Sequence, residues 1–424
     1  MAIGTSSAYG PSCMYDGPDD FPSGPLHDPV LATAQDRPNT ATIPALTDPS
    51  ADHVDPQVAE RRADVEEKHE RVVRFLDERG LDAVVLTRAD SVAWFTSGGD
   101  LSSDLGGDHA SVMIFINRNS RAVLADNVQS ARVFEEELAG LGFQLKERPW
   151  YEDPISVVAE LAHNRKVVTD NGVRGLPNDA PSLQSLRLTL SKRERQLMRE
   201  LGRSLTLAVE ATCRNFNPGE NEAEIAGHLA HRLFREGVVP LDIRVAGDDR
   251  LERFRQPTFK AAPIRHRATI AATGRRHGLC ASLTRTVAFG PIDETVRKDH
   301  YLASMVAATY IYFSRPGERI GDVYRRARRI YEKYGRPDEW MLDYQGFITG
   351  HHPRTRVLKP QDDFLLEAEM AVRWGPSVGA CSVEDTIVVD ARGGYEVVTE
   401  AQNWPKVGVQ VKGYALPRPS ILVR

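Results

Sequence analysis

Histidine and arginine side chains gather at a few points in the C-terminal half of the chain. The candidate residues stand in or near three short strings, Gly278–Thr286, Thr349–His351 and Ser382–Thr386: Arg265, His266, His277, Ser282, Arg285, Tyr344, Gln345, His351, His352, Arg354, Trp374 and Glu384. A histidine can exchange a proton near neutral pH, and an arginine fork can hold a substrate carboxylate through two hydrogen bonds. Because the set is rich in His and Arg and poor in carboxylates, it indicates acid–base chemistry on a small anionic molecule.

Composition excludes several other classes of protein. The chain has 424 residues, of which 41% are hydrophobic and 27% charged, as in a globular protein. A net charge of -5 supplies no positive field for a nucleic acid. The four cysteines have no C-x-x-C spacing, and neither a membrane span nor a signal peptide is visible. We therefore expect a cytoplasmic protein that contacts neither nucleic acid nor membrane.

The N-terminal part reads as an arm followed by an α/β domain. Residues 1–56 are rich in Pro, Asp, Ser, Gly and Ala, and such a segment buries too little apolar surface to order itself, so we predict a disordered or extended arm. A helix is expected over residues 57–79, ended by Gly80. Apolar runs of strand length alternate with helical segments up to residue 185: strands at 81–86, 111–116, 121–125 and 166–169, helices at 128–141 and 155–163.

A second domain is predicted for residues 190–424. The pattern Ser191-Lys-Arg-Glu194 is typical of a capping box at the start of a helix, and Asn221-Glu-Ala-Glu224 starts another helix. The elements that follow are strands at 268–272 and 279–288, helices at 292–314 and 320–334, and strands at 370–374, 383–389 and 396–399. This order predicts an α+β domain with a curved antiparallel sheet backed by helices.

Three strings in this domain resemble those of the creatinase and aminopeptidase P family. Gly278-Leu-Cys-Ala-Ser-Leu-Thr-Arg-Thr286 resembles G-Y-x-S-D-x-T-R-T, Thr349-Gly-His351 resembles T-G-H-G, and Ser382-Val-Glu-Asp-Thr386 resembles R-x-E-D-T. The resemblance covers about residues 60–405 and implies an α/β N-terminal domain followed by a pita-bread catalytic domain. It also implies a homodimer, because relatives are commonly homodimers.

The metal ligands that the resemblance implies are mostly missing. Metallopeptidases of this family hold two divalent ions with two Asp, one His and two Glu. The Asp positions carry Ala271 and Ser282, and the first Glu position falls at Gly375. Only His351 and Glu384 match the ligand types. One carboxylate cannot neutralise two divalent ions in a closed site, so we expect a divergent member without a metal or another cofactor.

Creatinase suggests how such a site could work, because that branch uses a His as acid and base and needs no metal. By this resemblance His351 or His266 would transfer the proton, and Glu384 would anchor the substrate. The other candidates are expected to bind substrate: Arg265, Arg285, His352, Arg354, Tyr344, Trp374, Ser282 and His277. The arginines favour an anionic substrate over a guanidinium cation.

Several of these residues also have a structural interpretation. Arg285 could pair with a carboxylate beneath the sheet, and Trp374 could belong to the core. Ser282 is a small polar replacement for Asp unless a base lies within hydrogen-bond distance. His277 falls at a hairpin turn, where exposure without function is the simpler interpretation.

Three functions follow from these patterns. The first is a metal-independent, creatinase-like enzyme for a small amino-acid-derived acid, catalysing C–N hydrolysis, elimination, decarboxylation or cyclisation. The second is an Xaa-Pro-type metallopeptidase with unusual ligands, and the third is a catalytically silent pita-bread module that binds a peptide or protein. The first is favoured, because new His and Arg residues, rather than simple apolar filling, accompany the loss of the ligands.

Overall fold

The computed structural model describes residues 55–173 and 175–424. The expected arm of residues 1–56 lies almost entirely outside the described residues. Helix α1 (Pro56–Arg79) starts where the Asp55 side chain accepts a hydrogen bond from the Gln57 N–H. It ends at Gly80 in the left-handed conformation, with φ of 61°. The expected helix and its glycine stop are confirmed.

The first domain is a mixed sheet with the strand order β4-β3-β2-β1-β5. The strands are β1 (Ala83–Arg88), β2 (His109–Asn117), β3 (Arg121–Asp126), β4 (Gln144–Arg148) and β5 (Val167–Thr169). The helices besides α1 are α2 (Ala89–Phe95), α3 (Ser130–Arg132), α4 (Ile155–Ala162) and α5 (Ala180–Ser185). The helix expected over 128–141 is wrong in extent: α3 continues as a π-helical turn over Val133–Glu137 and stops before Gly140 and Gly142, which have positive φ.

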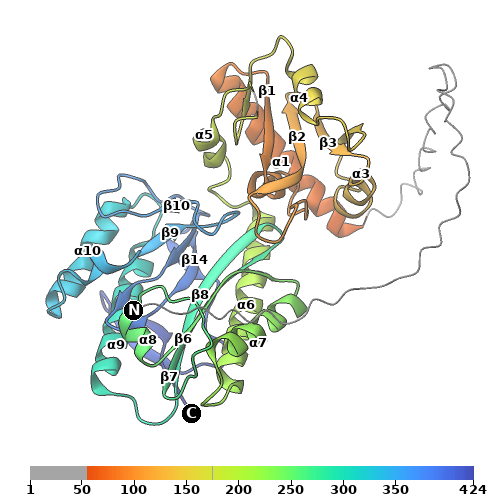
Figure 1. Ribbon diagram of the computed structural model, residues 1–424. Helices are drawn as coiled ribbons and strands as arrows, with labels where there is room; N and C mark the ends of the chain where they lie inside the picture. The colour runs from red at the N-terminus through yellow and green to blue at the C-terminus, as the bar shows by residue number, and fades with distance from the viewer. Residues whose placement is uncertain (1–54, 174) are drawn as a thin grey trace, which may run out of the picture. The chain divides into compact units, whose positions relative to one another are not determined.

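Two capped helices open the second domain. Helix α6 (Lys192–Asn215) has the capping box predicted for Ser191 and Glu194, and α7 (Glu222–Arg235) has one formed by Asn221 and Glu224. Both helices lie over the first sheet of the domain in Figure 1. Their apolar faces and the strands form one core, which includes Leu201, Leu229 and Leu283.

That first sheet has the order β18-β8-β7-β6. Its strands are β6 (Val239–Gly247), β7 (Arg267–Arg276), β8 (Leu279–Ala288) and β18 (Leu422–Val423), and the short helix α8 (Asp249–Arg253) follows β6. Strands β7 and β8 are an antiparallel hairpin, as the sequence predicted.

The second sheet has the order β10-β9-β11-β14-β15 and packs against α9 (Glu294–Phe313), which packs in turn on α10 (Ile320–Lys333). Its strands are β9 (Gly346–Ile348), β10 (Arg356–Val357), β11 (Ala371–Trp374), β14 (Asp385–Asp390) and β15 (Gly394–Val397). The remaining elements are a 3₁₀ turn (Glu339–Leu342), β12 (Ser377–Val378), β13 (Cys381–Ser382), β16 (Lys406–Val411) and β17 (Tyr414–Pro419). The two sheets meet where the Thr284 N–H donates to the Glu384 carbonyl at 3.0 Å. Largely antiparallel sheets backed by helices confirm the predicted fold class.

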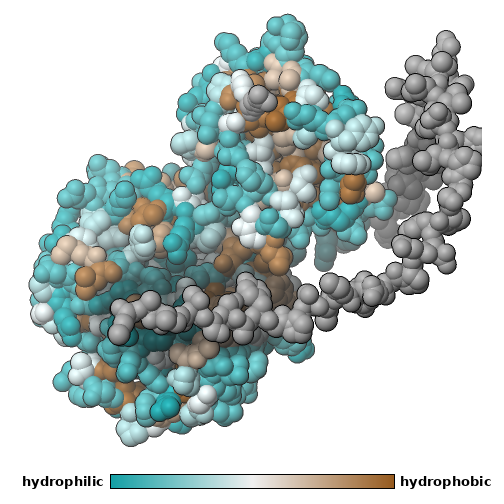
Figure 2. Space-filling model, viewed as in Figure 1, coloured by the Kyte–Doolittle hydropathy of each residue, from teal (hydrophilic) through white to brown (hydrophobic). Residues whose placement is uncertain are grey.

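The surface seen in Figure 2 is mainly hydrophilic, with hydrophobic residues in small separate groups. Among the described residues, none of the helices combines the length and the apolar character needed to cross a lipid bilayer.

Candidate functional site

Three of the four carboxylate positions of the metallopeptidase pattern, Ala271, Gly375 and Glu384, line one cleft of the second domain. Ala271 lies on β7, and its neighbour across the hairpin is Thr284 of β8. Glu384 precedes β14, and its Oε2 is 3.4 Å from the Thr284 hydroxyl. Gly375 follows β11, and a Cβ at this glycine would lie only 3.3 Å from Cγ of Glu384. Sequence positions far apart are thereby brought together around a single carboxylate.

The guanidinium of Arg373 lies between Glu384 and Ser282, the fourth carboxylate position. Its Nε lies 2.9 Å from Oε1 of Glu384, and its Nη1 donates to the Ser282 hydroxyl at 3.2 Å. Arg373 is 5% exposed and lies over the Phe347 ring, 4.7 Å from its centroid. Burial lowers the pKa of Arg373, although the charge of Glu384 opposes this shift. The Arg373 guanidinium therefore connects Ser282, at the second Asp position, with Glu384, at the second Glu position.

A second arginine contacts the same carboxylate and extends the polar network. Arg244 lies 3.4 Å from Oε2 of Glu384 and also donates to the Gln256 side chain. Gln256 donates in turn to both carboxylate oxygens of Asp343, at 2.8 and 2.9 Å. Burial raises the pKa of Asp343, while the Gln256 hydrogen bond partly opposes this. Asp343 is thus a cleft carboxyl whose pKa lies closer to neutral pH than that of an ordinary aspartate.

Arg255 also lines the cleft. Its guanidinium pairs with Glu339 at 2.6 Å and donates to the Ser377 hydroxyl at 3.3 Å. The free volume between these side chains is only about 40 Å³, whereas ligand pockets commonly have several hundred Å³. A substrate must therefore displace contacts that the arginines of the cleft make with neighbouring side chains, such as those of Gln256 and Ser377.

These residues do not fit a dinuclear metal centre. A pair of divalent ions carries four positive charges, which the four carboxylates of the family's ligand set would balance. Here the position holds one carboxylate, Glu384, already paired with two arginines, Arg244 and Arg373. Within residues 55–173 and 175–424, no three His, Cys, Asp or Glu side chains are grouped closely enough to hold a metal ion.

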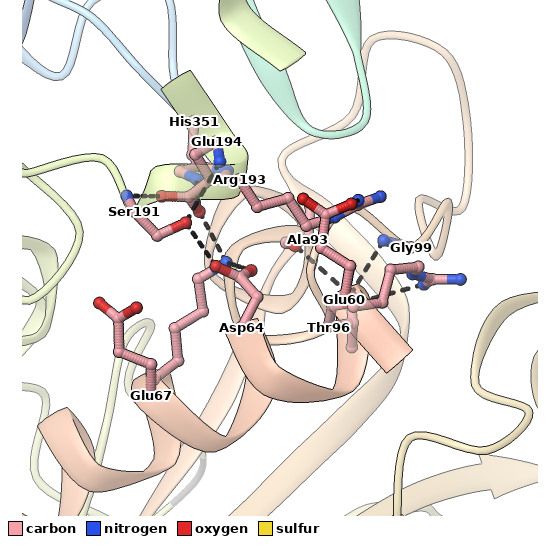
Figure 3. Close-up of polar contacts among 12 residues, drawn as sticks. Glu60, Asp64, Glu67, Ala93, Thr96, Gly99, Ser191, Arg193, Glu194 and His351 are labelled. Carbon is pink, nitrogen blue, oxygen red and sulfur yellow. Dashed lines mark hydrogen bonds and ion pairs between the residues drawn. The ribbon is translucent and has the colours of Figure 1, made fainter. Parts of the chain in front are cut away.

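His351, the other residue that matches a metal ligand, does not line this cleft. Its Nε2 donates to Oε1 of Glu194 at 2.8 Å, at the start of α6. Lys68 of α1 lies 2.7 Å from the same carboxylate atom and 2.5 Å from Asp64. Figure 3 shows His351, Glu194 and Asp64 converging, with Ser191 donating to Asp64. His351 and Glu384 therefore belong to separate environments. Gly350, the residue before His351, pairs with Cys280 of β8. Glu384 contacts Thr284, which lies four residues, or roughly 13 Å, farther along the same strand.

Other predicted substrate-binding residues are also placed differently from the expectation. Arg285 is fully buried and pairs with Asp385 at 3.2 Å and with Glu210 at 3.6 Å, beneath the sheet. Trp374 is fully buried in the core, where it stacks on Tyr310 with ring centroids 4.3 Å apart. Neither residue reaches the cleft, because Trp374 packs in the apolar core and Arg285 forms buried ion pairs. Their structural interpretations are the ones that hold.

The remaining predicted residues lie around the cleft or on the surface. Arg265 and His266 are exposed before β7, and their backbone N–H groups donate to Asp248. Arg354 is exposed and lies over Phe347, on whose ring Arg373 also packs. The other positions are as follows: Tyr344 is exposed, Gln345 is buried against Tyr331, His352 is half-buried, and His277 is exposed at the β7–β8 turn with φ of 50°. His266 and Arg265 are therefore corrected from cleft residues to surface residues.

The residues that define the cleft were mostly not singled out from the sequence. Arg373 stands in Met-Ala-Val-Arg-Trp as a lone charge within an apolar, buried strand. Such a charge needs a partner, and this signal could have identified Arg373. Arg244 stands in Leu-Asp-Ile-Arg-Val-Ala, two residues after Asp242, with which it pairs at 3.1 Å, and gives no such signal. Asp343, Gln256 and Arg255 lie in connecting segments, where no pattern distinguishes them.

Two antiparallel-rich halves around an inner cleft, preceded by an α/β domain, define the class of pita-bread proteins. A profile of metallopeptidase family M24 matches residues 196–391. The Xaa-Pro dipeptidase of Pyrococcus furiosus is 19% identical over 356 residues, covering 78% of this chain and 97% of that protein. The second domain is a member of family M24, so the resemblance to creatinase and aminopeptidase P is confirmed.

Solved structures agree on the fold. The Xaa-Pro dipeptidase from Bacillus anthracis superimposes with a TM-score of 0.69 at 17% identity, covering 85% of this chain and 100% of that one. The N-terminal domain of FACT complex subunit SPT16 from Cicer arietinum gives 0.62 at 13% identity, covering 83% and 98%. The chain therefore shares its fold, at low identity, with peptidases and with a domain of a FACT complex subunit. The matching profile and the Pyrococcus furiosus relative both carry peptidase descriptions.

Proposed function

We propose that the cleft around Glu384 hydrolyses a C–N bond in a small, amino-acid-derived substrate that carries a free carboxylate, and that it does so without a dinuclear metal centre. The observation that carries this proposal is that Glu384, at a metal-ligand position of the family, is paired with Arg373 and also lies beside Arg244. These guanidinium groups already balance the charge of Glu384, so no divalent cation is needed there for electrostatic balance. Family membership supports hydrolysis as the reaction class.

Recognition of the substrate is assigned to the arginines with the most solvent access. The side chains of Arg244 and Arg255 are 13% and 26% exposed, against 6% for Arg373. Each presents a planar fork that matches a carboxylate. A substrate carboxylate would take over hydrogen bonds that Gln256 and Ser377 now accept, which compensates for opening the narrow cleft.

Proton transfer is assigned to Asp343. Its carboxyl lies in the same cleft, and its pKa is raised by burial. In the proposed reaction water adds to the carbonyl carbon, the C–N bond breaks, and the amine leaves with the proton that Asp343 took from the water. A group that accepts and returns one proton suits this sequence. This role replaces the one that the sequence suggested for His351 and His266.

Family membership alone supports a second candidate, an Xaa-Pro-type metallopeptidase with unusual ligands. The matching profile and the Pyrococcus furiosus relative both carry a peptidase description. In this chain only Glu384 and His351 keep the ligand types, and each is engaged by another side chain.

One set of measurements separates the candidates. The full chain is purified without chelator, its metal content is measured, and amine release is assayed from Xaa-Pro dipeptides and from N-carbamoyl and N-amidino amino acids. We expect substoichiometric metal, turnover that is insensitive to EDTA, and a raised KM in Arg244→Met but not in the exposed control Arg265→Met. Stoichiometric metal with activity abolished by EDTA would establish the metallopeptidase instead. Carboxylate binding without turnover of any substrate would indicate a silent binding module.

A further inference from the structure

A pocket in the first domain lies apart from the cleft around Glu384. It has a volume of about 460 Å³, which is within the range of sites for small organic molecules. All of its lining residues fall between Thr87 and Val173, and none of them lines the cleft. The pocket is therefore independent of the proposed hydrolysis.

The sheet of the first domain places this pocket where its strands end. Strands β1 and β5 are parallel, as are β3 and β4, and β2 runs antiparallel to both β1 and β3. Four strands therefore have their carboxyl ends at the same edge of the sheet. The lining includes Thr87 of β1, Asp126 of β3, Arg148 of β4 and Asn171 just after β5, all at that edge. Open α/β sheets commonly bind their ligands at this edge.

The pocket has an apolar base and an aromatic rim. Met113 of β2, Leu124 of β3 and Val157 of α4 line the base and belong to one apolar cluster on that face of the sheet. The segment after β4 supplies Trp150, whose side chain is 68% exposed and whose backbone N–H donates to the Asn127 side chain at 2.8 Å. A large exposed aromatic residue beside an apolar cavity is typical of a binding site.

The lining also carries charges of both signs. Lys146 and Arg148 are positive, and Asp126 and Glu152 are negative, so these charges cancel. Arg148 is already engaged, because its guanidinium lies 3.0 Å from Glu160 and 3.9 Å from Glu152. Neither Asp126 nor Lys146 forms an ion pair with another described residue. A ligand with one positive and one negative group would match these two remaining charges.

Asp126 and Lys146 lie on the same face of neighbouring strands. Lys146 is paired with Leu124 in the register of β3 and β4, so Asp126 is its diagonal neighbour. The bases of such side chains are roughly 7–8 Å apart. Oδ1 of Asp126 accepts from the N–H groups of Val128 and Gln129 at 2.9 and 2.8 Å, which leaves Oδ2 to accept from a ligand. An α-amino acid carries its ammonium and carboxylate groups on one carbon, and therefore fits between the two charges.

The uncharged polar groups of the lining are mostly engaged with the protein. The hydroxyl groups of Thr87 and Ser111 donate to protein oxygens at 2.9 and 3.1 Å, and the His109 ring contacts the Asn171 amide at 3.4 Å. Recognition of a ligand therefore depends on the two charges and on the apolar base.

We propose that this pocket binds a free amino acid with a large apolar side chain. The ammonium group of the ligand donates to Asp126, and its carboxylate accepts from Lys146. Both contacts are hydrogen bonds between opposite charges. The side chain of the ligand covers the apolar base beside Trp150, which removes apolar surface from water.

Calorimetric titration of the full chain tests the proposal with L-phenylalanine as the probe. Phenylacetate lacks the ammonium group, phenethylamine lacks the carboxylate, and L-serine lacks the apolar side chain. We expect one saturable site for L-phenylalanine and binding at least roughly tenfold weaker for each of the other three, since each loses a charged or an apolar contact. Equal binding of phenylacetate, or no binding of L-phenylalanine at about 10 mM, would overturn the proposal.

Three variants establish where the probe binds. Lys146→Met removes the positive charge. Asp126→Asn removes the negative charge but keeps an oxygen that can accept from Val128 and Gln129. We expect each of these variants, and Trp150→Ala, to weaken binding of L-phenylalanine by roughly tenfold.

The matched controls are Lys166→Met and Tyr151→Ala, because both residues are exposed in the first domain and neither lines the pocket. Both controls should bind L-phenylalanine as the unmodified chain does, and thermal unfolding establishes that each variant is folded. Binding that survives in both Lys146→Met and Trp150→Ala would place the amino acid elsewhere and overturn the proposal. A dimer in sedimentation that dissociates in Trp150→Ala would mean that a second copy covers the pocket, which also overturns it.

Discussion

Nε of Arg373 lies 2.9 Å from Oε1 of Glu384, the residue at the second Glu position of the family's metal-ligand pattern. Three substitutions relative to that pattern are compatible with this pair. Ser282 accepts a hydrogen bond from Arg373 instead of carrying a charge, Ala271 leaves space, and Gly375 avoids a second carboxylate against Glu384. These three residues are therefore compatible with the ion pair on which the proposed function depends.

Glu384 is predicted to matter more for stability than Arg373. Glu384→Gln leaves two arginines, Arg244 and Arg373, without the carboxylate that they share, whereas Arg373→Met leaves Glu384 paired with Arg244. Breaking a buried pair commonly costs about 3–5 kcal/mol. We expect Glu384→Gln to approach this loss, Arg373→Met to lose clearly less, and urea unfolding to measure both. Equal losses would mean that Arg244 does not compensate.

Restoring the metal ligands should fail while Arg373 is present. The triple variant Ala271→Asp, Ser282→Asp and Gly375→Glu returns three carboxylates, but a guanidinium still lies between them. We expect Mn²⁺ binding, followed by calorimetry, only after the further change Arg373→Ala, because that change removes the competing cation. Tight binding by the triple variant would show that Arg373 does not occupy the metal position.

The sequence predicted much of this fold but little of the cleft. Helix caps such as Ser191 and Gly80 are local, and their partners lie within a few residues. The cleft instead depends on contacts between distant positions, as when Arg373 reaches Ser282 across 91 residues. Motif matching singled out Glu384, which lines the cleft, but it could not show that His351 turns to Glu194, since Glu194 already had a local explanation as a capping residue.

Glu194 should make the protein sensitive to acid. Burial alone would raise its pKa, but the charges of Lys68 and His351 outweigh burial and hold the pKa well below the ordinary 4.5. A carboxyl whose pKa is depressed by folding stabilises the folded state above its unfolded pKa, and this contribution is lost as the pH falls. We expect the free energy of unfolding to decline below about pH 4.5. In Glu194→Gln the decline should be shallower, whereas an unchanged slope would contradict the assignment.

The three described cysteines should be inert towards thiol reagents in the folded protein. Burial raises the pKa of Cys213, Cys280 and Cys381 to about 12 each, and only a thiolate reacts rapidly. In a Cys13→Ser variant we expect no reaction with Ellman's reagent at pH 8 until denaturant is added. Rapid labelling in the native state would show that one of these buried thiols becomes accessible.

Gly98 and Gly80 offer a matched test of how closely the two domains approach. Both have positive φ, so alanine at either position is strained by about 1 kcal/mol. A Cβ at Gly80 would meet nothing within 4 Å, whereas one at Gly98 would lie 2.8 Å from Cβ of His277 and 3.0 Å from its carbonyl oxygen. Gly98→Ala should therefore reduce the unfolding free energy by about 1–3 kcal/mol more than Gly80→Ala. Because the clash is with the β7–β8 turn, Gly98→Ala should also increase hydrogen exchange at residues 277–278. Equal stabilities for the two variants would mean that the turn moves freely away from the first domain.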